Sequence, residues 1–258
     1  MTMDGLPCGR VPRSRSGFTL VELLLATTLA ALLILGLVQV VAAASAAGSL
    51  QRNQAQIQDH ARFAIGILSQ TIRQAGFRPE PWNAAYAEEA LNQRTLDGVT
   101  ASGDRLVVRG WSDLNCFDSR NPDVDGAGQP RFYLRETVFD LTGDQSLTRL
   151  CRYGPNAAEL TTQVKRQGLV PGVESFQALF GEDTDQDGNV ERWVAAGQWS
   201  DPQRVLGVRL GLLFASEESV IEPLPQQHRV LDTFTSSVAD GKLRRVFEFA
   251  VAIRSRLP

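Results

Sequence analysis

The sequence is poor in the side chains on which most enzymes depend. Its 258 residues include only three cysteines and two histidines, His60 and His228. It contains no G-x-S-x-G, H-E-x-x-H, P-loop or dinucleotide-binding glycine pattern, and no nucleophile motif accompanies either histidine. We therefore expect a protein that is not an enzyme.

An excess of positive charge is also missing. The 26 Lys and Arg against 29 Asp and Glu give a formal net charge of −3. Loss of residues 1–17, which hold three arginines and one aspartate, would bring it to −5, because −3 − 3 + 1 = −5. Neither value provides the basic surface that nucleic-acid binding requires. No nucleic-acid partner is expected.

What the sequence does contain is one long apolar segment near its start. It runs from Gly17 to about Ala47, and its only charged side chain is Glu22. A bilayer span needs about 20 apolar residues, so this segment is long enough to cross a membrane. The three arginines before Gly17 predict a cytoplasmic N-terminus and an exported C-terminal part. Because a charge inside such a segment is costly, Glu22 is a functional candidate.

A secretory signal peptide is an alternative interpretation of this segment. The small residues of Ala42–Ala46 have the spacing that a signal peptidase accepts, and cleavage there would release a periplasmic protein. A signal peptide's apolar region is about 7 to 15 residues long, however, and rarely carries an acid in its first turn. The length of the segment and Glu22 both favour a retained membrane anchor.

The junction itself resembles the type IV prepilin signal, in which a short basic leader ends in glycine and Phe-Thr-Leu-Val-Glu-Leu follows. The resemblance implies that a prepilin peptidase cuts after Gly17 and methylates the new amino terminus at Phe18. It also implies a role for Glu22, which would neutralise the terminal ammonium of a neighbouring subunit. A carboxylate that only stabilises the first turn of a membrane helix is the simpler alternative.

The helical period continues beyond the apolar segment. Apolar residues recur at steps of three and four as far as Ala75, and Gly76, Pro79 and Pro81 then end the helix. Within it, the segment 59–77 resembles PilW-type minor pilins, which read roughly E-x-x-R-F-A-x-x-x-L-x-x-x-I-R-x-A-G-[YF]. The J-type pseudopilins of type II secretion share parts of this pattern. His60 is expected at the surface of this helix or in an interface.

The rest of the chain is mostly β in pattern. Seven strands are predicted, at 105–111, 131–139, 146–153, 173–180, 204–215, 229–234 and 244–256. A short helix is predicted at 84–92, and loops at 121–130 and 223–227. The last strand should turn its Phe247 face to the core.

The predicted fold class is α+β and pilin-like, with a long N-terminal helix packed on a mostly antiparallel β-sheet. The predicted domains are a cleaved leader (1–17), a membrane or assembly half of the helix (18–47), an amphipathic half (48–77) and a periplasmic β-rich domain (78–258).

The cysteines agree with an exported protein. Cys8 lies in the leader, which leaves Cys116 and Cys151 as an even pair. In an oxidising compartment such a pair predicts a disulfide. Two metal-binding thiolates are the alternative, but neither C-x-x-C spacing nor a nearby histidine accompanies them.

One acidic loop has the pattern of a calcium site. Residues 183–191 read DTDQDGNVE, with acids at alternate positions and a glycine for a sharp turn. The predicted calcium ligands are Asp183, Asp185, Asp187, the Asn189 carbonyl and Glu191. An EF-hand proper is not expected, because Val194 stands where its bidentate acid belongs. The alternative is a solvated hairpin turn.

The resemblance implies a minor pilin that waits in the inner membrane as a single-pass protein, with its C-terminal domain in the periplasm, before it enters the pilus. Its expected partners are the prepilin peptidase, other minor pilins and a tip adhesin, and its expected role is to prime the fibre and lie at its tip. Two alternatives stay open: a J-type pseudopilin of a type II secretion system, and a released, calcium-responsive periplasmic domain.

Overall fold

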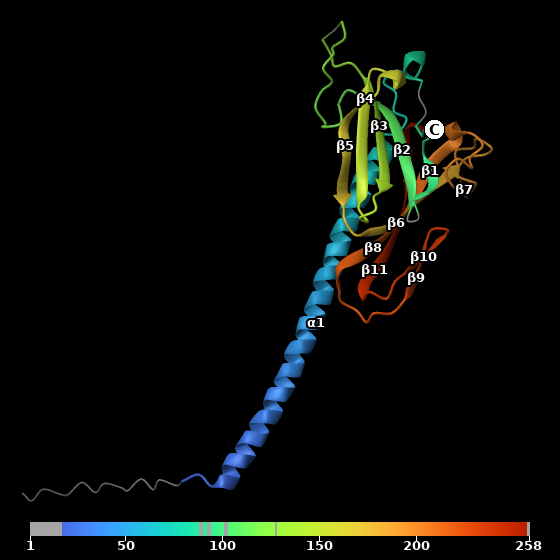
Figure 1. Cartoon of the computed structure of the whole chain (residues 1–258). Helices are drawn as coiled ribbons and strands as arrows, with labels where there is room; N and C mark the ends of the chain where they lie inside the picture. Colours follow the sequence, from blue (N-terminus) through green and yellow to red (C-terminus); the bar gives the residue numbers. More distant parts are fainter. Residues whose placement is uncertain (1–16, 88–89, 92–93, 101–102, 127, 257–258) are drawn as a thin grey trace, which may run out of the picture. The chain divides into compact units, whose positions relative to one another are not determined.

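The computed structural model describes residues 17–87, 90–91, 94–100, 103–126 and 128–256 (Figure 1). The predicted leader and Cys8 therefore lie outside the described residues. The chain forms two compact units, residues 1–48 and residues 49–258, which we describe separately.

The first unit consists of the N-terminal part of helix α1 (Leu20–Arg73). From Gly17 to Ala47 every residue is exposed within the protein. A helix that is apolar on all sides belongs in lipid or among other helices. α1 is long and apolar enough to cross a membrane.

In the second unit α1 buries one stripe against the sheet. The stripe contains residues at steps of three and four: Ile57, Ala61, Ala64, Leu68 and Ile72. This matches the predicted amphipathic half. Ile65, another apolar residue of the same half, is only half-buried. Small residues at two of these positions let the helix backbone approach the sheet closely. Phe63, on another face, stays 53% exposed.

Within the described residues the sheet has nine strands and is antiparallel except at one joint. The main path runs in the order β11-β8-β6-β2-β3-β4-β5, while β1 pairs with β2 and β7 with β6. A separate hairpin is formed by β9 and β10 (Figure 1). The strands are β1 (Leu96–Thr100), β2 (Gly103–Ser112), β3 (Tyr133–Leu141), β4 (Leu147–Gly154), β5 (Thr161–Val170), β6 (Val173–Glu182), β7 (Arg192–Val194), β8 (Val205–Ser219), β9 (Gln226–Val230), β10 (Thr233–Ser237) and β11 (Lys242–Ala252).

The parallel joint between β2 and β6 rests on two residues. Gly103 pairs with Phe176, and a Cβ at Gly103 would come within 2.5 Å of the Phe176 carbonyl oxygen. Next to it, the buried Asp104 carboxylate accepts hydrogen bonds from the main-chain N–H groups of Gly98 (2.9 Å) and Ala178 (2.7 Å). Burial raises the pKa of Asp104 to about 6 although these two hydrogen bonds oppose the shift. The side chain thus links the two antiparallel groups of strands.

Most of the predicted elements are confirmed. Strands β2, β3, β4, β6, β8 and β11 lie where the sequence predicts strands, and Phe247 packs against the core. The last strand is shorter than predicted, because it ends at Ala252 and a 3₁₀ turn, η4 (Arg254–Arg256), follows. The described part of the predicted short helix contains only the 3₁₀ turn η1 (Ala84–Tyr86).

One predicted strand is interrupted by a turn. Of residues 229–234, the first two end β9 and the last two begin β10, and Leu231 in the turn between them adopts a positive φ of 54°. The predicted loop at 223–227 accordingly ends two residues earlier, at Pro225, because β9 begins at Gln226. Strands β1, β5 and β7 were not predicted, because β5 and β7 are largely solvated edges and β1 carries a central glycine.

The β9–β10 hairpin packs over the outer face of β8 at a glycine. A Cβ at Gly211 would come within 2.7 Å of Val230. His228, on β9, is half-buried, and its Nε2 has no hydrogen-bond partner among the described residues. Burial is the main cause that lowers the pKa of His228, and the positive charge of Arg244 adds to it, while Glu174 opposes the shift.

The lowered pKa predicts a pH-dependent stability. The folded state binds a proton on His228 less readily than the unfolded state. The neutral imidazole therefore stabilises the fold above the unfolded pKa of about 6.5, and this contribution is lost as pH falls below that value and through the lower pKa of the folded state. We expect His228→Gln to lose less thermal stability than the parent protein between pH 7.5 and pH 5.5. His60→Gln is the matched control and should lose as much thermal stability between these two pH values as the parent protein. Equal losses in the parent protein and His228→Gln would contradict the assignment.

Candidate functional site

The first candidate site is the start of α1. Thr19 precedes the helix, and its main-chain N–H donates a hydrogen bond of 3.2 Å to the Glu22 carboxylate. In return the Glu22 N–H donates to the Thr19 hydroxyl over 3.3 Å. This reciprocal arrangement is a capping box, in which a helix-start Thr and a Glu three residues later satisfy each other's N–H groups. The T-x-x-E spacing is visible in the sequence, although no role was predicted for Thr19.

The capping box bears on the predicted role of Glu22. Within a single chain the carboxylate already accepts local hydrogen bonds at the helix start, where the dipole favours negative charge. Gly17 and Phe18 lie directly before Thr19 in the chain and are exposed. A terminal ammonium at Phe18 would therefore lie one residue before the capping threonine. The predicted pairing between subunits remains a prediction.

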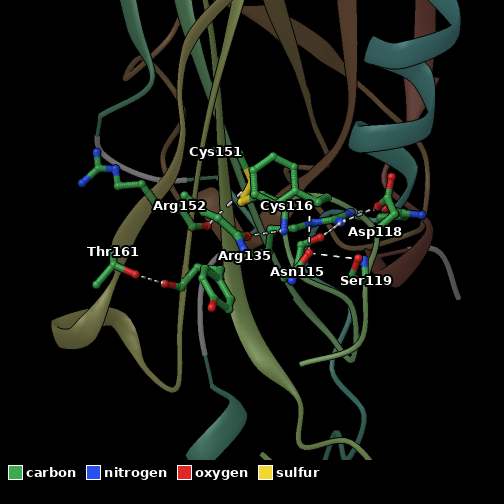
Figure 2. Close-up of a disulfide and its surroundings, with 12 residues drawn as sticks. Asn115, Cys116, Asp118, Ser119, Arg135, Cys151, Arg152 and Thr161 are labelled. Carbon is green, nitrogen blue, oxygen red and sulfur yellow. Dashed lines mark hydrogen bonds and ion pairs between the residues drawn. A yellow bond between two sulfur atoms is a disulfide. The ribbon is translucent and has the colours of Figure 1, made fainter. Parts of the chain in front are cut away.

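The second candidate site is the disulfide predicted from the cysteine count. Cys116 and Cys151 are bonded, with their Cα atoms 5.9 Å apart (Figure 2). This confirms the disulfide and removes the alternative of two metal-binding thiolates. Cys151 lies on β4, whereas Cys116 lies in the segment between β2 and β3. The bond thus fixes the segment between β2 and β3, which we call the disulfide segment, to the sheet.

Arg135 on β3 strengthens the same connection. Its guanidinium donates to the Asn115 carbonyl (3.4 Å), pairs with Asp118 (3.2 Å) and donates to the Gln74 side chain (2.8 Å). Figure 2 shows Arg135 reaching from the strand toward Asn115 and Asp118. One arginine therefore joins the disulfide segment, the sheet and the residue after α1. No motif in the sequence identified it.

The third candidate site is the acidic loop that follows β6. Ligand atoms of Asp183, Asp185, Asp187 and Glu191 lie within 4.8 Å of one another. The structure thus brings together all four acids that the sequence predicts. Val194 lies in β7 and pairs with Phe180 on β6, so strands flank the loop and it is not an EF-hand.

The loop is closed by its own hydrogen bonds. Asp183 accepts from the N–H groups of Gln186 (2.5 Å) and Gly188 (2.9 Å), and Glu191 accepts from the Thr184 N–H (2.7 Å). Gln186 and Gly188 both have positive φ, 67° and 88°. Hydrogen bonds from Asn189 are the main cause that lowers the pKa of Asp187.

Oxygen donors at this spacing suit a hard cation such as calcium. A carboxylate oxygen that accepts one hydrogen bond still has a lone pair for a metal. The residues therefore fit the ion, and the Asn189 carbonyl belongs to the same loop. Calcium binding remains a prediction.

A buried acid that the sequence analysis missed holds the base of this loop. Glu182 is fully buried and accepts two hydrogen bonds from Arg192 (2.9 and 2.7 Å) and others from Ser200, including one of 2.7 Å from its N–H. Burial alone would raise the pKa of Glu182, but the hydrogen bonds from Ser200 and Arg192 outweigh it, and the pKa is lowered. Glu182 directly precedes the four acids of the loop, and nothing in the sequence distinguishes it from them.

The disulfide predicts a measurable stabilisation. Replacing both cysteines, in Cys116→Ser/Cys151→Ser, should lower the free energy of unfolding by about 3–4 kcal/mol, because the bond reduces the conformational entropy of the unfolded chain. Urea denaturation of the detergent-solubilised protein measures the change. Cys8→Ser is the control and should have no effect, and reductant should reproduce the double variant's loss in the parent protein. A change below about 1 kcal/mol would contradict the prediction.

Calcium binding predicts a thermal shift. At about ten times its Kd, calcium should stabilise the fold by about 1.4 kcal/mol and raise the melting temperature by about 3–6 °C. Asp185→Asn/Asp187→Asn removes two carboxylates while keeping the side-chain size, and should abolish the shift. Magnesium at the same concentration controls for ionic strength. No shift at millimolar calcium would leave the loop as a solvated turn.

Comparisons with known proteins agree with these features. A family model described as Type IV Pilus-assembly protein W matches residues 138–255, and one described as Prokaryotic N-terminal methylation motif matches residues 12–38. The first match runs from within β3 to within η4, whereas the helix segment 59–77, which resembles PilW-type minor pilins in sequence, lies outside it. No curated protein matches the chain.

A solved structure shows the same fold. The chain is similar to the Type IV-like pilin TTHA1219 from Thermus thermophilus, with a TM-score of 0.51 and 14% sequence identity, over 79% of this chain and 98% of that chain. The predicted α+β pilin-like fold is thus confirmed, and the methylation motif implies processing by a prepilin peptidase. A PilW domain behind a prepilin N-terminus supports a type IV pilus minor pilin of the PilW family, with a role in pilus assembly.

Proposed function

We propose that this minor pilin primes assembly of the pilus and lies at its tip with other minor pilins and an adhesin. The prepilin peptidase cuts after Gly17 and methylates Phe18. Before assembly the chain is held in the inner membrane, N-terminus in the cytoplasm and sheet domain in the periplasm, as the arginines before Gly17 favour.

The observation that carries the proposal is the start of α1. An apolar helix with no buried face carries one carboxylate, Glu22, three residues after its cap. In the membrane before assembly, this helix is surrounded by lipid. In a fibre, the apolar surfaces pack against equivalent helices, and each buried carboxylate needs an opposite charge. The ammonium of a neighbouring Phe18 supplies that charge.

The sheet domain supports a role in contacts rather than catalysis. Its described surface carries exposed aromatic side chains, among them Phe63 on α1 (53% exposed) and Phe117 beside the disulfide (64% exposed). The disulfide and Arg135 hold the segment around Phe117 in place without a ligand. Such fixed apolar groups suit contacts with other subunits.

The alternatives predict different behaviour. A released periplasmic domain requires cleavage near Ala42–Ala46, which lie inside the continuous helix α1. A J-type pseudopilin would have the same N-terminus but different companions. Co-purification from native membranes distinguishes a pilus from a type II secretion system, because each machine supplies its own partner proteins.

Three variants separate the charge of Glu22 from its capping role. Glu22→Gln keeps a hydrogen-bond acceptor for Thr19 but removes the charge, and should reduce piliation by about tenfold, equivalent to about 1.4 kcal/mol per subunit contact. Glu22→Ala removes both and should be at least as defective. Thr19→Val keeps the charge, costs about 1 kcal/mol of helix capping and should assemble nearly normally.

Electron microscopy and shear-fraction blots measure piliation in these strains. Intact mass establishes that each variant is cleaved at Gly17 and methylated, so that a processing defect is not mistaken for an assembly defect. Parent-level piliation with Glu22→Gln would disprove the charge pair. A strong defect with Thr19→Val would instead assign Glu22 to helix capping.

A further inference from the structure

A cavity of about 680 Å³ lies where the end of α1 meets the sheet. Its walls come from the last turn of α1, β2, the start of β3, the disulfide segment and η4. Gly110 and Arg135 are paired across β2 and β3, so they lie on the same face of the sheet. A Cβ at Gly110 would come within 2.6 Å of the Gln74 carbonyl oxygen, which places the chain just after α1 against this face.

One side of the cavity is aromatic. Phe77 and Phe132 both line it, and their ring centroids are 6.3 Å apart with planes tilted by 42°. Phe77 is 47% exposed and Phe132 is half-buried. The pair thus presents an apolar surface that no described residue of the chain fully covers.

Four arginines line the same cavity, Arg73, Arg109, Arg135 and Arg254. Arg109 is paired with the buried Glu136 carboxylate (2.8 Å). Arg135 is engaged by Asp118, Asn115 and Gln74. The guanidinium groups of Arg73 and Arg254 have neither an ion pair nor a hydrogen bond to any residue in the described part of the chain. Two cationic side chains therefore remain available at its walls.

Acidic side chains do not balance these charges. Of the two aspartates that line the cavity, Asp118 is the partner of Arg135, which leaves Asp113 against Arg73 and Arg254. The chain as a whole has a net charge of −3, so this region is locally cationic within an acidic protein. Guanidinium groups bind carboxylates through paired, charge-assisted hydrogen bonds.

We propose that this cavity is a docking site for a segment of a partner polypeptide, which places an apolar side chain against Phe77 and Phe132 and a carboxylate toward Arg73 and Arg254. The volume lies within the range of about 300–1,000 Å³ found for binding pockets. The carboxylate is either an acidic side chain or the end of a chain. The inference rests on the proposed assembly function, in which this protein joins other subunits.

Three capped peptides test the site by saturation-transfer NMR with the full-length mature protein in detergent. Acetyl-Ala-Phe-Glu-Ala-amide carries an acidic side chain, acetyl-Ala-Ala-Phe with a free carboxylate represents a chain end, and acetyl-Ala-Phe-Gln-Ala-amide is the neutral control. At least one acidic peptide should bind about tenfold more tightly than the neutral one, since it alone can pair with arginine. The better of the two identifies the source of the carboxylate.

Charge reversal locates the binding. Arg73→Glu/Arg254→Glu should weaken binding of the acidic peptide to the level of the neutral peptide. Both side chains are exposed and unpaired in the described structure, so the variant should keep its melting temperature, which is measured alongside. Arg245→Glu, an exposed arginine on β11 that does not line the cavity, is the matched control and should bind like the parent protein.

Equal binding of all three peptides, or an equal loss with Arg245→Glu, would overturn the proposal. These outcomes are independent of the Glu22 experiment. If Glu22→Gln blocks piliation but no peptide prefers the cavity, the docking site is wrong and the assembly function stands. If Glu22→Gln assembles normally while the acidic peptides still bind, the assembly mechanism is wrong and the cavity is a binding site with another use.

Discussion

The sheet domain depends on the packing of the second part of α1 against one face of the sheet. The buried stripe from Ile57 to Ile72 lies against inward-facing residues of β2, β6, β8 and β11, which form the main core. Burial of apolar surface contributes roughly 25 cal/mol per Å², so this contact stabilises the domain. The stripe must keep its helical period, because one misplaced residue would expose apolar groups on β8 or β6.

The same helix is shaped by different requirements along its length. In the first unit its side chains are apolar on every side, as lipid or a fibre interior requires, because backbone polar groups there must be satisfied within the helix. In the second unit its exposed side carries charged residues such as Arg62 and Asp59, which form an ion pair. An exposed pair of this kind contributes little to stability.

The candidate sites lie at places where regular structure ends. The capping box is at the start of α1, the cavity is where α1 ends against the sheet, and the acidic loop extends from the end of β6. Thr19 at the helix start is a local group, and its T-x-x-E spacing with Glu22 is visible in the sequence. Arg135 at the cavity and Glu182 at the acidic loop are different, because their partners lie 10 to 61 positions away and come within reach only once the chain has folded.

The sequence alone determined the class of the protein. Its one long apolar run, the Gly17–Phe18 junction and Glu22 are local features, and periodicity was enough to predict the helix and the well-buried strands. Only the tertiary structure decided the order of the strands, the hairpin at 226–237 and the parallel joint at Gly103, because pairing depends on contacts between residues far apart in the chain. The cavity is of the same kind. Arg73, Arg135 and Arg254 are separated by 62 and 119 positions, and folding alone brings them to one surface.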